Sequence, residues 1–547
     1  MAKKTSHYNR KTAEVQAFVA GLKENSLKGN AFDSATANDF VNQSLDGSGV
    51  KVPETLQAVF AEADEKQVRL VTRAILDSAT AYRDAHGVDA PADVLEHAMH
   101  LAYSTTNVAL DSTSENHAAL SLQPNRAVVA IMSAMSEAIP FAHYLPADIK
   151  SNEARLAIMS HQAGNKFGGY EKGELMDGVS SGGRYISTSR EHKCEILAEA
   201  ITGKITGVQK TDDTCDPDAA AVPLLRGRSI VYVNGQVSAR EVQSGGTGPS
   251  NISGQALVAG AMHNISGTID LDTGAIALTS SPELPVGTEV LVEAFIDYER
   301  DSDITPSVIT EVEMFSLYAN PWRVLTRQSI DSRTQMSSEL GLDPYSEGVI
   351  AIQAQFGNER HYDVLRKARR LAVGNQASFD FAWANKGDFR SRSDVWRDLS
   401  SVLGALSQQM ANDTMNHGIT HLYVGNYIGA QMHGLPSDIW TPSGISERPG
   451  IFRLGRLFGR YDVYYSPKGV VEALDGSTGE ILCIGQATDV TRNPFVLGDA
   501  VAPMVLPLSQ TSDMKSGAAF YARNFTAVNP HKPSSMACAR INVKNMI

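Results

Sequence analysis

The stretch "YSEGVIAIQAQFGNERHYDVLRKARRL", residues 345–371, carries apolar side chains at the spacing of an α-helix. They recur in two groups, first Val349, Ile352 and Phe356, then Val364, Ala368 and Leu371. Side chains at this spacing lie on one face of a helix, the face that packs against a core. Since a helix rises about 1.5 Å per residue, the stretch predicts a helix about 40 Å long.

A second helix and several strands follow and indicate an α/β unit. Ser393 is placed to cap this helix, Asp394 suits its positive end, and Gly418 closes it. Its apolar stripe consists of Val395, Leu399, Val402, Leu406 and Met410. The strand-like segments after it are "ITHLYVG" (419–425), "YDVYYSP" and "EILCIG". We therefore expect an α/β unit over residues 374–505.

The segment that leaves this unit, "RNPFVLGDAVAPMVLPLSQ" (492–510), has three prolines and only two charged side chains. Proline is tolerated at strand ends and edges, where no N–H is needed. We interpret the segment as a covered strand that returns the chain to the region of the long helix, over residues 506–547. A charge at Val496 or Leu506 is expected to block folding or assembly.

Upstream of the long helix, residues 164–183 read "GNKFGGYEKGELMDGVSSGG" and hold seven glycines between two strand-like segments. Glycine at this density favours a pliant excursion over a packed element, and loops of this length are usually functional. The pattern predicts an extended loop at 164–195.

Residues 196–303 change to short strands with turn signals, including Asn234-Gly235 in "RSIVYVNGQVSARE". Asn-Gly between alternating apolar residues is typical of a β-hairpin. We predict a small all-β domain inserted in the chain. Residues 1–123 show helical spacing broken by polar stretches, which indicates an N-terminal helical arm or accessory region.

Composition excludes several classes of protein. The 547 residues include 48 Lys and Arg against 61 Asp and Glu, a formal net charge of -13, which disfavours an outward-facing nucleic-acid binder. Four distant cysteines without a C-x-x-C pair indicate neither a zinc site nor a disulfide framework. No run approaches the roughly 18 apolar residues of a membrane span. We expect a chain that is made and stays soluble inside a cell.

The string most like a catalytic motif is Asp272-Thr273-Gly274, which is similar to the active-site loop of aspartic peptidases. That chemistry needs two carboxylates, and the chain has no second Asp-Thr/Ser-Gly. A hairpin turn explains the same residues. His97 and His100, and His417 and His421, lack the glutamate of a zinc-binding H-E-x-x-H motif. We therefore expect no catalytic residue, no metal and no cofactor.

Taken together, the order of these segments resembles the major capsid proteins of tailed bacteriophages, which have the Hong Kong 97-type fold. The Gly-rich segment resembles that family's extended loop, the long helix its spine helix, and the α/β unit its axial domain. The segment "EMFSLYANPWRVLTRQSIDSRTQMSSELGLDP" (313–344) is similar to the entry into the peripheral domain of the larger members. The likeness covers roughly residues 125–547, and the β insertion and the N-terminal region depart from it.

The resemblance implies an α+β fold divided as follows: arm 1–123, peripheral domain 124–163 and 304–373, extended loop 164–195, β domain 196–303, axial domain 374–505 and return to the peripheral domain 506–547. It implies a shell of hexamers and pentamers of this chain, assembled in the cytoplasm of a host bacterium around double-stranded DNA held as non-specific cargo, without a membrane. Portal, scaffold, vertex or cement proteins would be further partners. The residues expected to contact other subunits are Lys166, Phe167, Gly168, Gly169, Tyr170, Lys172, Arg184, Trp322, Arg366, Arg370, Trp383 and Trp396.

Four alternatives stay open at this point. Two concern the whole chain, which could instead be a tail or baseplate component whose β domain binds a receptor, or an aspartic-type peptidase that uses Asp272. Trp383 and Trp396, which lie among arginines, are either core aromatics or stacking groups for a ligand. Lys166 and Lys172 are solvated lysines or, by the resemblance, crosslinking groups, and we expect no cleavage of the N-terminus.

Overall fold

This computed structural model describes residues 7–28, 31–32, 34–47, 49–61, 65–107, 128, 130–148, 151–242, 248–339, 344–382, 391–508 and 515–546. The chain divides into two compact units. Unit 1 consists of Met1–Ile158 and Met314–Ile547, and unit 2 of Met159–Glu313. Each unit is described by itself.

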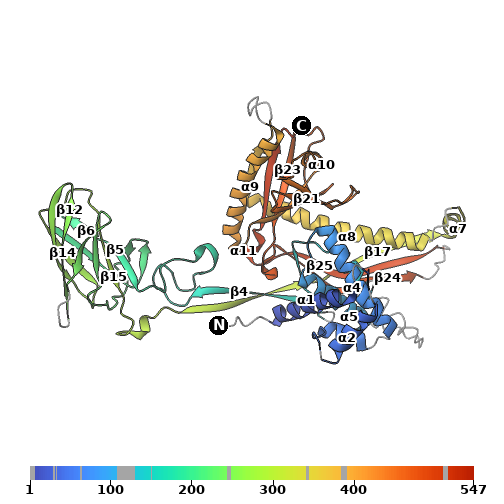
Figure 1. Cartoon of the computed structure of the whole chain (residues 1–547), viewed down its shortest axis with the longest axis horizontal. Coiled ribbons are helices and arrows are strands. Elements are labelled where there is room, and N and C mark those ends of the chain that lie inside the picture. Colours follow the sequence, from blue (N-terminus) through green and yellow to red (C-terminus); the bar gives the residue numbers. More distant parts are fainter. Residues whose placement is uncertain are drawn as a thin grey trace. The chain divides into compact units, whose positions relative to one another are not determined.

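In unit 1 the long helix predicted from the sequence is confirmed as α8 (Pro344–Leu371), and it packs beside a four-stranded sheet (Figure 1). The strands of that sheet, in order, are β17 (Asn320–Ser329), β25 (Lys515–Val528), β24 (Phe495–Leu508) and β3 (Ala142–Tyr144). Phe356 of α8 reaches Trp322 and Phe520 of the sheet at ring-centroid distances of 5.1 and 5.3 Å. A short helix, α7 (Ile330–Glu339), lies between β17 and α8 in the chain.

The proline-rich segment forms β24, as the sequence predicts for a covered strand. Val496 and Phe495 are fully buried. The pairing of β24 with β25 shifts register between Asp499 and Val501 and again between Val501 and Met504. Pro503 lies inside the second irregularity, where a missing N–H costs no ladder hydrogen bond.

A seven-stranded mixed sheet forms the second half of unit 1. Its order is β18 (Gln376–Asp380), β26 (Cys538–Lys544), β23 (Thr478–Gly485), β19 (Ile419–Val424), β22 (Tyr461–Tyr465), β21 (Phe452–Leu457) and β20 (Trp440–Pro442). The helices α9 (Arg392–Thr414) and α10 (Asn426–Met432) share one apolar core with it, and α11 (Lys532–Ser535) contacts α9. The sequence predicted the C-terminal residues to return to the peripheral domain. This is wrong for β26, which lies inside the seven-stranded sheet between β18 and β23.

The predicted caps of α9 are also corrected. Ser391, not Ser393, is the N-cap, and its backbone N–H donates to Asp394 Oδ2 at 3.0 Å. The helix ends at Met415, whose φ of 58° is left-handed, rather than at Gly418. Two serines so close together make the cap residue ambiguous in sequence.

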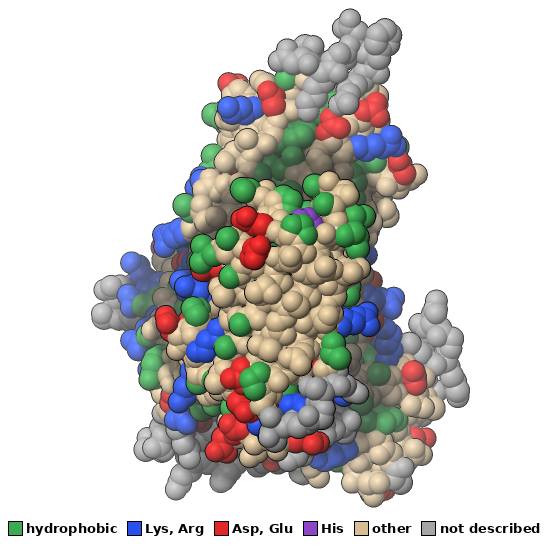
Figure 2. All heavy atoms as spheres, turned by 90° about the vertical axis from the view of Figure 1, so that its left-hand side faces the viewer, with side chains coloured by type: hydrophobic (Ala, Val, Ile, Leu, Met, Phe, Trp, Pro, Cys, Tyr) green, Lys and Arg blue, Asp and Glu red, His purple; other side chains and the backbone are tan. Residues whose placement is uncertain are grey.

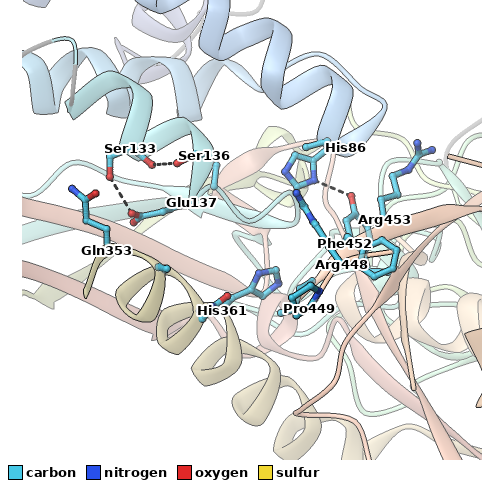
Figure 3. Close-up of a pocket in the computed structure, with 18 of the residues that line it drawn as sticks. His86, Ser133, Ser136, Glu137, Gln353, His361, Arg448, Pro449, Phe452 and Arg453 are labelled. Carbon is cyan, nitrogen blue, oxygen red and sulfur yellow. Dashed lines mark hydrogen bonds between the residues drawn. The ribbon is translucent and has the colours of Figure 1, made fainter. Parts of the chain in front are cut away.

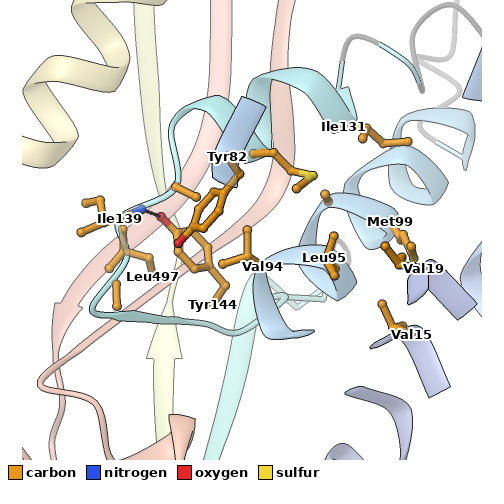
Figure 4. Packing of buried hydrophobic residues seen from close by; sticks show 14 of the residues in the cluster. Val15, Val19, Tyr82, Val94, Leu95, Met99, Ile131, Ile139, Tyr144 and Leu497 are labelled. Carbon is orange, nitrogen blue, oxygen red and sulfur yellow. Dashed lines mark hydrogen bonds between the residues drawn. The ribbon is translucent and has the colours of Figure 1, made fainter. Parts of the chain in front are cut away.

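The N-terminal helices are not a separate arm. They are α1 (His7–Ser26), α2 (Ser34–Leu45), α3 (Glu54–Ala61), α4 (Glu65–His86) and α5 (Ala92–Asn107), with the strands β1 (Leu27–Lys28) and β2 (Ala31–Phe32) after α1. Phe18 of α1 and Val94 of α5 belong to the same apolar core as Leu365 of α8 and Tyr423 of β19. Figure 4 shows Tyr82, Val94 and Tyr144 packed in this core. Local helical spacing could not reveal these long-range contacts.

Unit 2 is built mainly from a nine-stranded sheet. The order of its strands is β5 (Ser189–Lys193), β15 (Val290–Phe295), β10 (Ile230–Val233), β11 (Gln236–Glu241), β12 (Ser250–Val258), β13 (Ala261–Ile269), β14 (Ala275–Ser281), β7 (Ala200–Lys204) and β6 (Glu195–Leu197). A smaller pair consists of β8 (Gln209–Thr211) and β9 (Thr214–Cys215). The predicted hairpin turn at Asn234-Gly235 is confirmed, because both residues have positive φ and join β10 to β11.

The Gly-rich segment is not the pliant loop that its composition predicted. Phe167, Tyr170 and Tyr185 are buried in the core of unit 2, and the Tyr170 and Tyr185 rings meet edge to face at 5.5 Å. Gly168 has a φ of +57°, and a Cβ there would lie 1.8 Å from the Arg184 carbonyl oxygen. The glycines therefore let the backbone pack closely around aromatic anchors.

The strands β4 (Glu153–Ala163) and β16 (Val308–Tyr318) form a two-stranded sheet, through which the chain enters and leaves unit 2. None of the described helices combines the length and the apolar composition needed to cross a membrane.

Candidate functional site

A buried ion cluster joins α5, α8 and β24 in unit 1. Asp499 Oδ2 lies 2.8 Å from His97 Nε2 and accepts a hydrogen bond from Arg360 Nη1 at 3.2 Å. The three side chains are almost completely buried, with side-chain exposures of 1–4%. Burial alone raises the pKa of Asp499, but the positive charge of Arg360 and the contact with His97 outweigh it and hold the pKa below its ordinary value. The low pKa of the buried Asp499 carboxylate therefore depends on Arg360 and His97.

A second buried carboxylate organises the short strand β3. Asp93 Oδ2 accepts a hydrogen bond from the Tyr144 backbone N–H at 3.0 Å and lies 3.2 Å from His143 Nδ1. The hydroxyl oxygen of Tyr144 in turn accepts a hydrogen bond from the Ile139 N–H at 2.8 Å. Because these groups satisfy backbone donors inside the core, their role is to hold the chain in place.

Beside the ion cluster lies an open cleft of about 750 Å³, shown in Figure 3. His86 enters it from the end of α4 and His361 from α8. His86 Nδ1 lies 3.0 Å from the Tyr464 hydroxyl, and His361 Nε2 lies 3.0 Å from the Tyr423 hydroxyl. Burial lowers the pKa of His86 to about 4 and that of His361 to about 3. Both imidazoles are neutral at pH 7 and serve as hydrogen-bond partners of tyrosines.

Glu137 is the titratable group of this cleft whose pKa lies nearest neutrality. Its Oε1 accepts a hydrogen bond from the Ser133 hydroxyl at 3.0 Å, drawn in Figure 3. Burial raises its pKa from 4.5 to about 7, although Arg360 and Ser133 act in the opposite direction. Asp499 adds a further negative charge and raises the pKa as well.

We expect Glu137→Gln to change how stability depends on pH. Because the pKa of Glu137 is raised in the folded chain, its contribution to stability is fully present below about pH 4.5 and is lost as the pH rises to about 7. Glutamine carries no charge and suffers no such loss. The free energy of unfolding of the variant minus that of the unchanged chain should therefore increase from pH 5 to pH 7.5 and stay constant above it. Urea denaturation across this range measures the difference, and a constant difference would contradict the assignment.

In the described residues these side chains take part in packing, hydrogen bonds and ion pairs. Among the described residues no group of three or more His, Cys, Asp or Glu is placed to hold a metal ion. Asp272 lies in the exposed turn between β13 and β14, where it forms an ion pair with Arg300. Asp270, rather than a catalytic partner, orders this turn by accepting hydrogen bonds from the Asp272 N–H at 3.0 Å and from the Thr273 hydroxyl at 2.6 Å. The residues Asp272-Thr273-Gly274 thus form the hairpin turn that the sequence offered as the other explanation of this string.

The subunit-contact residues predicted in unit 2 fall into three groups by burial. Phe167 and Tyr170 are core residues and Gly168 is buried, so these three are wrong as surface residues. The half-buried Arg184 forms an ion pair with Glu191 at 2.5 Å. The exposed residues are Lys166, Gly169 and Lys172, of which Lys166 forms an ion pair with Glu171 at 2.7 Å.

In unit 1, Trp396 is 1% exposed and packs against Phe381 at 5.0 Å, so it is a core aromatic and not a contact or stacking residue. Trp383 lies outside the described residues. Arg366 and Arg370 are exposed on α8. Trp322 is half-buried and, with Val324 and Phe356, lines a second cavity of about 340 Å³ between β17 and α8.

Two exposed apolar strands were missed by the sequence reasoning. On β16, Val308, Val312 and Met314 point to one face and are 50–63% exposed. On β17, an edge strand of the four-stranded sheet, Val324 and Leu325 are 47% and 58% exposed. Alternating apolar residues normally indicate a half-buried strand, so only the structure shows that these side chains lack cover from the described chain.

A scan against protein-family models and a search of curated proteins found no match to this chain. Among solved structures, the capsid of the jumbo bacteriophage PhiKZ matches at 9% identity and a TM-score of 0.38, over 74% of this chain and 91% of that one. A chain of Microbacterium phage Oxtober96 matches at 12% identity and a TM-score of 0.30, over 61% and 95%. The SrpI encapsulin of Synechococcus elongatus matches at 11% identity and a TM-score of 0.28, over 45% and 80%. The chain is thus similar in part to phage capsid and encapsulin proteins of very different sequence.

Proposed function

We propose that this chain is a structural shell subunit, the major capsid protein of a tailed bacteriophage, which self-assembles into an icosahedral head around double-stranded DNA. The observation that carries the proposal is β16, an 11-residue strand on which every residue is exposed or half-buried and on which Val308, Val312 and Met314 form an apolar stripe. Such a stripe is a surface for association, because contact with another chain removes apolar side chains from water.

The edge of the four-stranded sheet supports the same function. Natural proteins protect a long edge strand, since its free N–H and C=O groups can pair with another chain. The ten-residue strand β17 pairs with β25 on one side and, among the described strands, with none on the other. Its apolar residues Val324 and Leu325 are exposed. In an assembly of many copies, a neighbouring copy would cover this edge strand.

The remaining elements fit the parts of a shell subunit. We assign the role of the extended loop to the two-stranded sheet of β4 and β16, which would lie over a neighbouring subunit. The chain would form hexamers and pentamers, assemble in the cytoplasm of the host bacterium, and meet portal, scaffold or cement proteins there. A net charge of -13 disfavours tight binding of packaged DNA, which would be held as cargo. The proposal gives the chain no catalytic role.

Negative-stain microscopy of the purified full chain tests the proposal directly. We expect closed shells, curved sheets or hexamers, with sedimentation far above that of a 58.8 kDa monomer. A monodisperse monomer at all concentrations would contradict the proposal.

Val312→Lys is expected to reduce assembly. An unpaired ammonium buried in a contact costs free energy, and a loss of about 1–3 kcal/mol per contact lowers the association constant roughly 10- to 100-fold. Val286→Lys is the matched control, because Val286 is fully exposed in unit 2 and lies outside β16. The fraction of chain in particles, measured by sedimentation velocity, should fall for Val312→Lys alone. Equal assembly of the two variants would exclude β16 from the contact.

A further inference from the structure

One face of unit 2 has a charged side chain only at its edge, where Lys204 of β7 pairs in register with Ala275. The rest of the face is formed by the uncharged outward-pointing residues of four adjacent strands, β12, β13, β14 and β7. These residues, all exposed or half-buried, are Asn251, Ser253, Gln255, Leu257, Met262, Asn264, Ser266, Thr268, Ala275, Ala277, Thr279, Ser281, Ala200 and Thr202. We call this set the neutral face. Figure 2, which looks onto the side where Figure 1 labels β12 and β14, shows a broad area without blue or red.

The absence of charge extends along the sequence as well. Residues 242–269 contain no Asp, Glu, Lys or Arg, in a chain of which 20% of residues are charged. Charge returns at the borders of the face: Arg240 of β11 pairs in register with Ser253, Glu195 of β6 pairs with Thr202, and Lys204 of β7 pairs with Ala275. The neutral face is therefore a bounded region of a strongly acidic chain.

The side chains of the neutral face form ordered rows across the strands. Ser266 stands opposite Ser253 on one side and Thr279 on the other. The Thr279 hydroxyl donates to the Ser266 carbonyl at 3.0 Å, and Gln255 Nε2 donates to Asn264 Oδ1 at 3.0 Å. Cross-strand contacts of this kind hold the side chains in place before any partner arrives. At the end of the face, Leu257 and Met262 are paired and are 62% and 53% exposed.

These features suit contact with an identical surface. In a contact across a two-fold axis the residues at the axis lie near their own copies, so a charge close to the axis meets the same sign. Hydroxyl and amide groups act as both donors and acceptors, so they can hydrogen-bond to their own copies. Small side chains such as those of Ser266 and Ala277 also allow two sheets to approach closely, and Leu257 and Met262 supply apolar area at the border.

We infer that the neutral face of unit 2 binds the neutral face of a second copy of this chain across a two-fold axis. The inference rests on the proposed function, because a shell brings many copies of the chain together at high local concentration. It goes beyond that function by assigning unit 2 a contact between subunits, rather than a position on the outer surface without such contacts. A charged partner would find no opposite charge among these residues, whereas the hydroxyls and amides of a second copy can donate to and accept from those of the first.

Charge substitutions at Ser266 test this inference in the full chain. Ser266→Lys and Ser266→Glu each place like charges against each other across the axis. Each variant alone should therefore show at least tenfold less association between unit 2 of one copy and unit 2 of another. A mixture of the two variants pairs Lys with Glu and should recover association. Ser181→Lys, at an exposed serine outside the neutral face, is the control and should associate like the unchanged chain.

Crosslinking gives a second measurement. The four native cysteines are buried, so in Ser266→Cys particles treated with a mild oxidant we expect disulfide-linked dimers on a non-reducing gel, and none for Ser181→Cys. Normal association of Ser266→Lys, or loss of association by both charge variants that their mixture does not recover, would overturn the inference. If the unchanged chain forms particles and the Ser266 substitutions have no effect on them, this contact alone is refuted. If the unchanged chain is a monomer, the shell function itself is refuted.

Discussion

Replacing Asp499 by Ala is expected to lower the free energy of unfolding by about 3–5 kcal/mol, because it leaves a buried arginine without its counterion. The Asp499 side chain is 4% exposed and is the hydrogen-bond partner of both Arg360 and His97. Once the carboxylate is removed, the Arg360 guanidinium stays buried without its hydrogen-bonded counterion, and Glu137, whose pKa burial raises to about 7, is the acidic neighbour that remains. The cavity beside the cluster, about 10 Å³, has room for no more than a single water molecule and cannot solvate that charge.

Two further variants separate the ion pair from a general effect of losing an aspartate. Asp438→Ala removes a carboxylate that forms an exposed ion pair with Arg397, in which both side chains are 56% exposed, and should have little effect on stability. The double variant Asp499→Ala with Arg360→Met removes both charges and should be more stable than Asp499→Ala alone. Urea denaturation followed by circular dichroism measures all three. A double variant no more stable than the single one would contradict the unpaired charge as the cause.

The second large effect is expected for Val496→Asp, which should abolish folding. Val496 is fully buried on β24 and packs in a core with Leu145, Ile158 and Phe525. A carboxylate at this position would lie in an apolar core without a counterion. Burying an unpaired carboxylate costs several kcal/mol, which is a large part of the roughly 5–15 kcal/mol by which folded domains are usually stable. Soluble yield and far-ultraviolet circular dichroism detect the loss, and no particles should form.

Val373→Asp is the matched control for this experiment. Val373 is 60% exposed, also in unit 1, so the same substitution there leaves the new carboxylate in water and should leave folding intact. Normal folding of Val496→Asp would show that β24 is not the covered strand that its burial indicates. The Leu506 side chain, for which the sequence made the same prediction, lies outside the described side chains.

Local patterns predicted local structure well. The spacing of Val364 and Ala368 predicted α8, the Asn234-Gly235 pair predicted a hairpin, and the composition of 492–510 predicted a covered strand. These features depend on neighbours within a few residues, which the linear sequence contains. The same reasoning failed for the Gly-rich segment, because glycine content reports freedom of the backbone and not the aromatic anchors, Phe167 and Tyr185, that remove this freedom by long-range packing.

The candidate site divides in the same way. From its sequence alone the chain could be described as acidic, rich in regular structure and without a recognisable catalytic motif, because charge and motif spacing are properties of the chain itself. Only the tertiary structure brings His97, Arg360 and Asp499 into one cluster, places the N-terminal helices in the core of unit 1, and leaves β16, β17 and the neutral face uncovered. Burial depends on contacts between residues hundreds of positions apart. No local pattern therefore distinguishes an apolar or neutral strand that its own chain covers from one that its own chain leaves exposed.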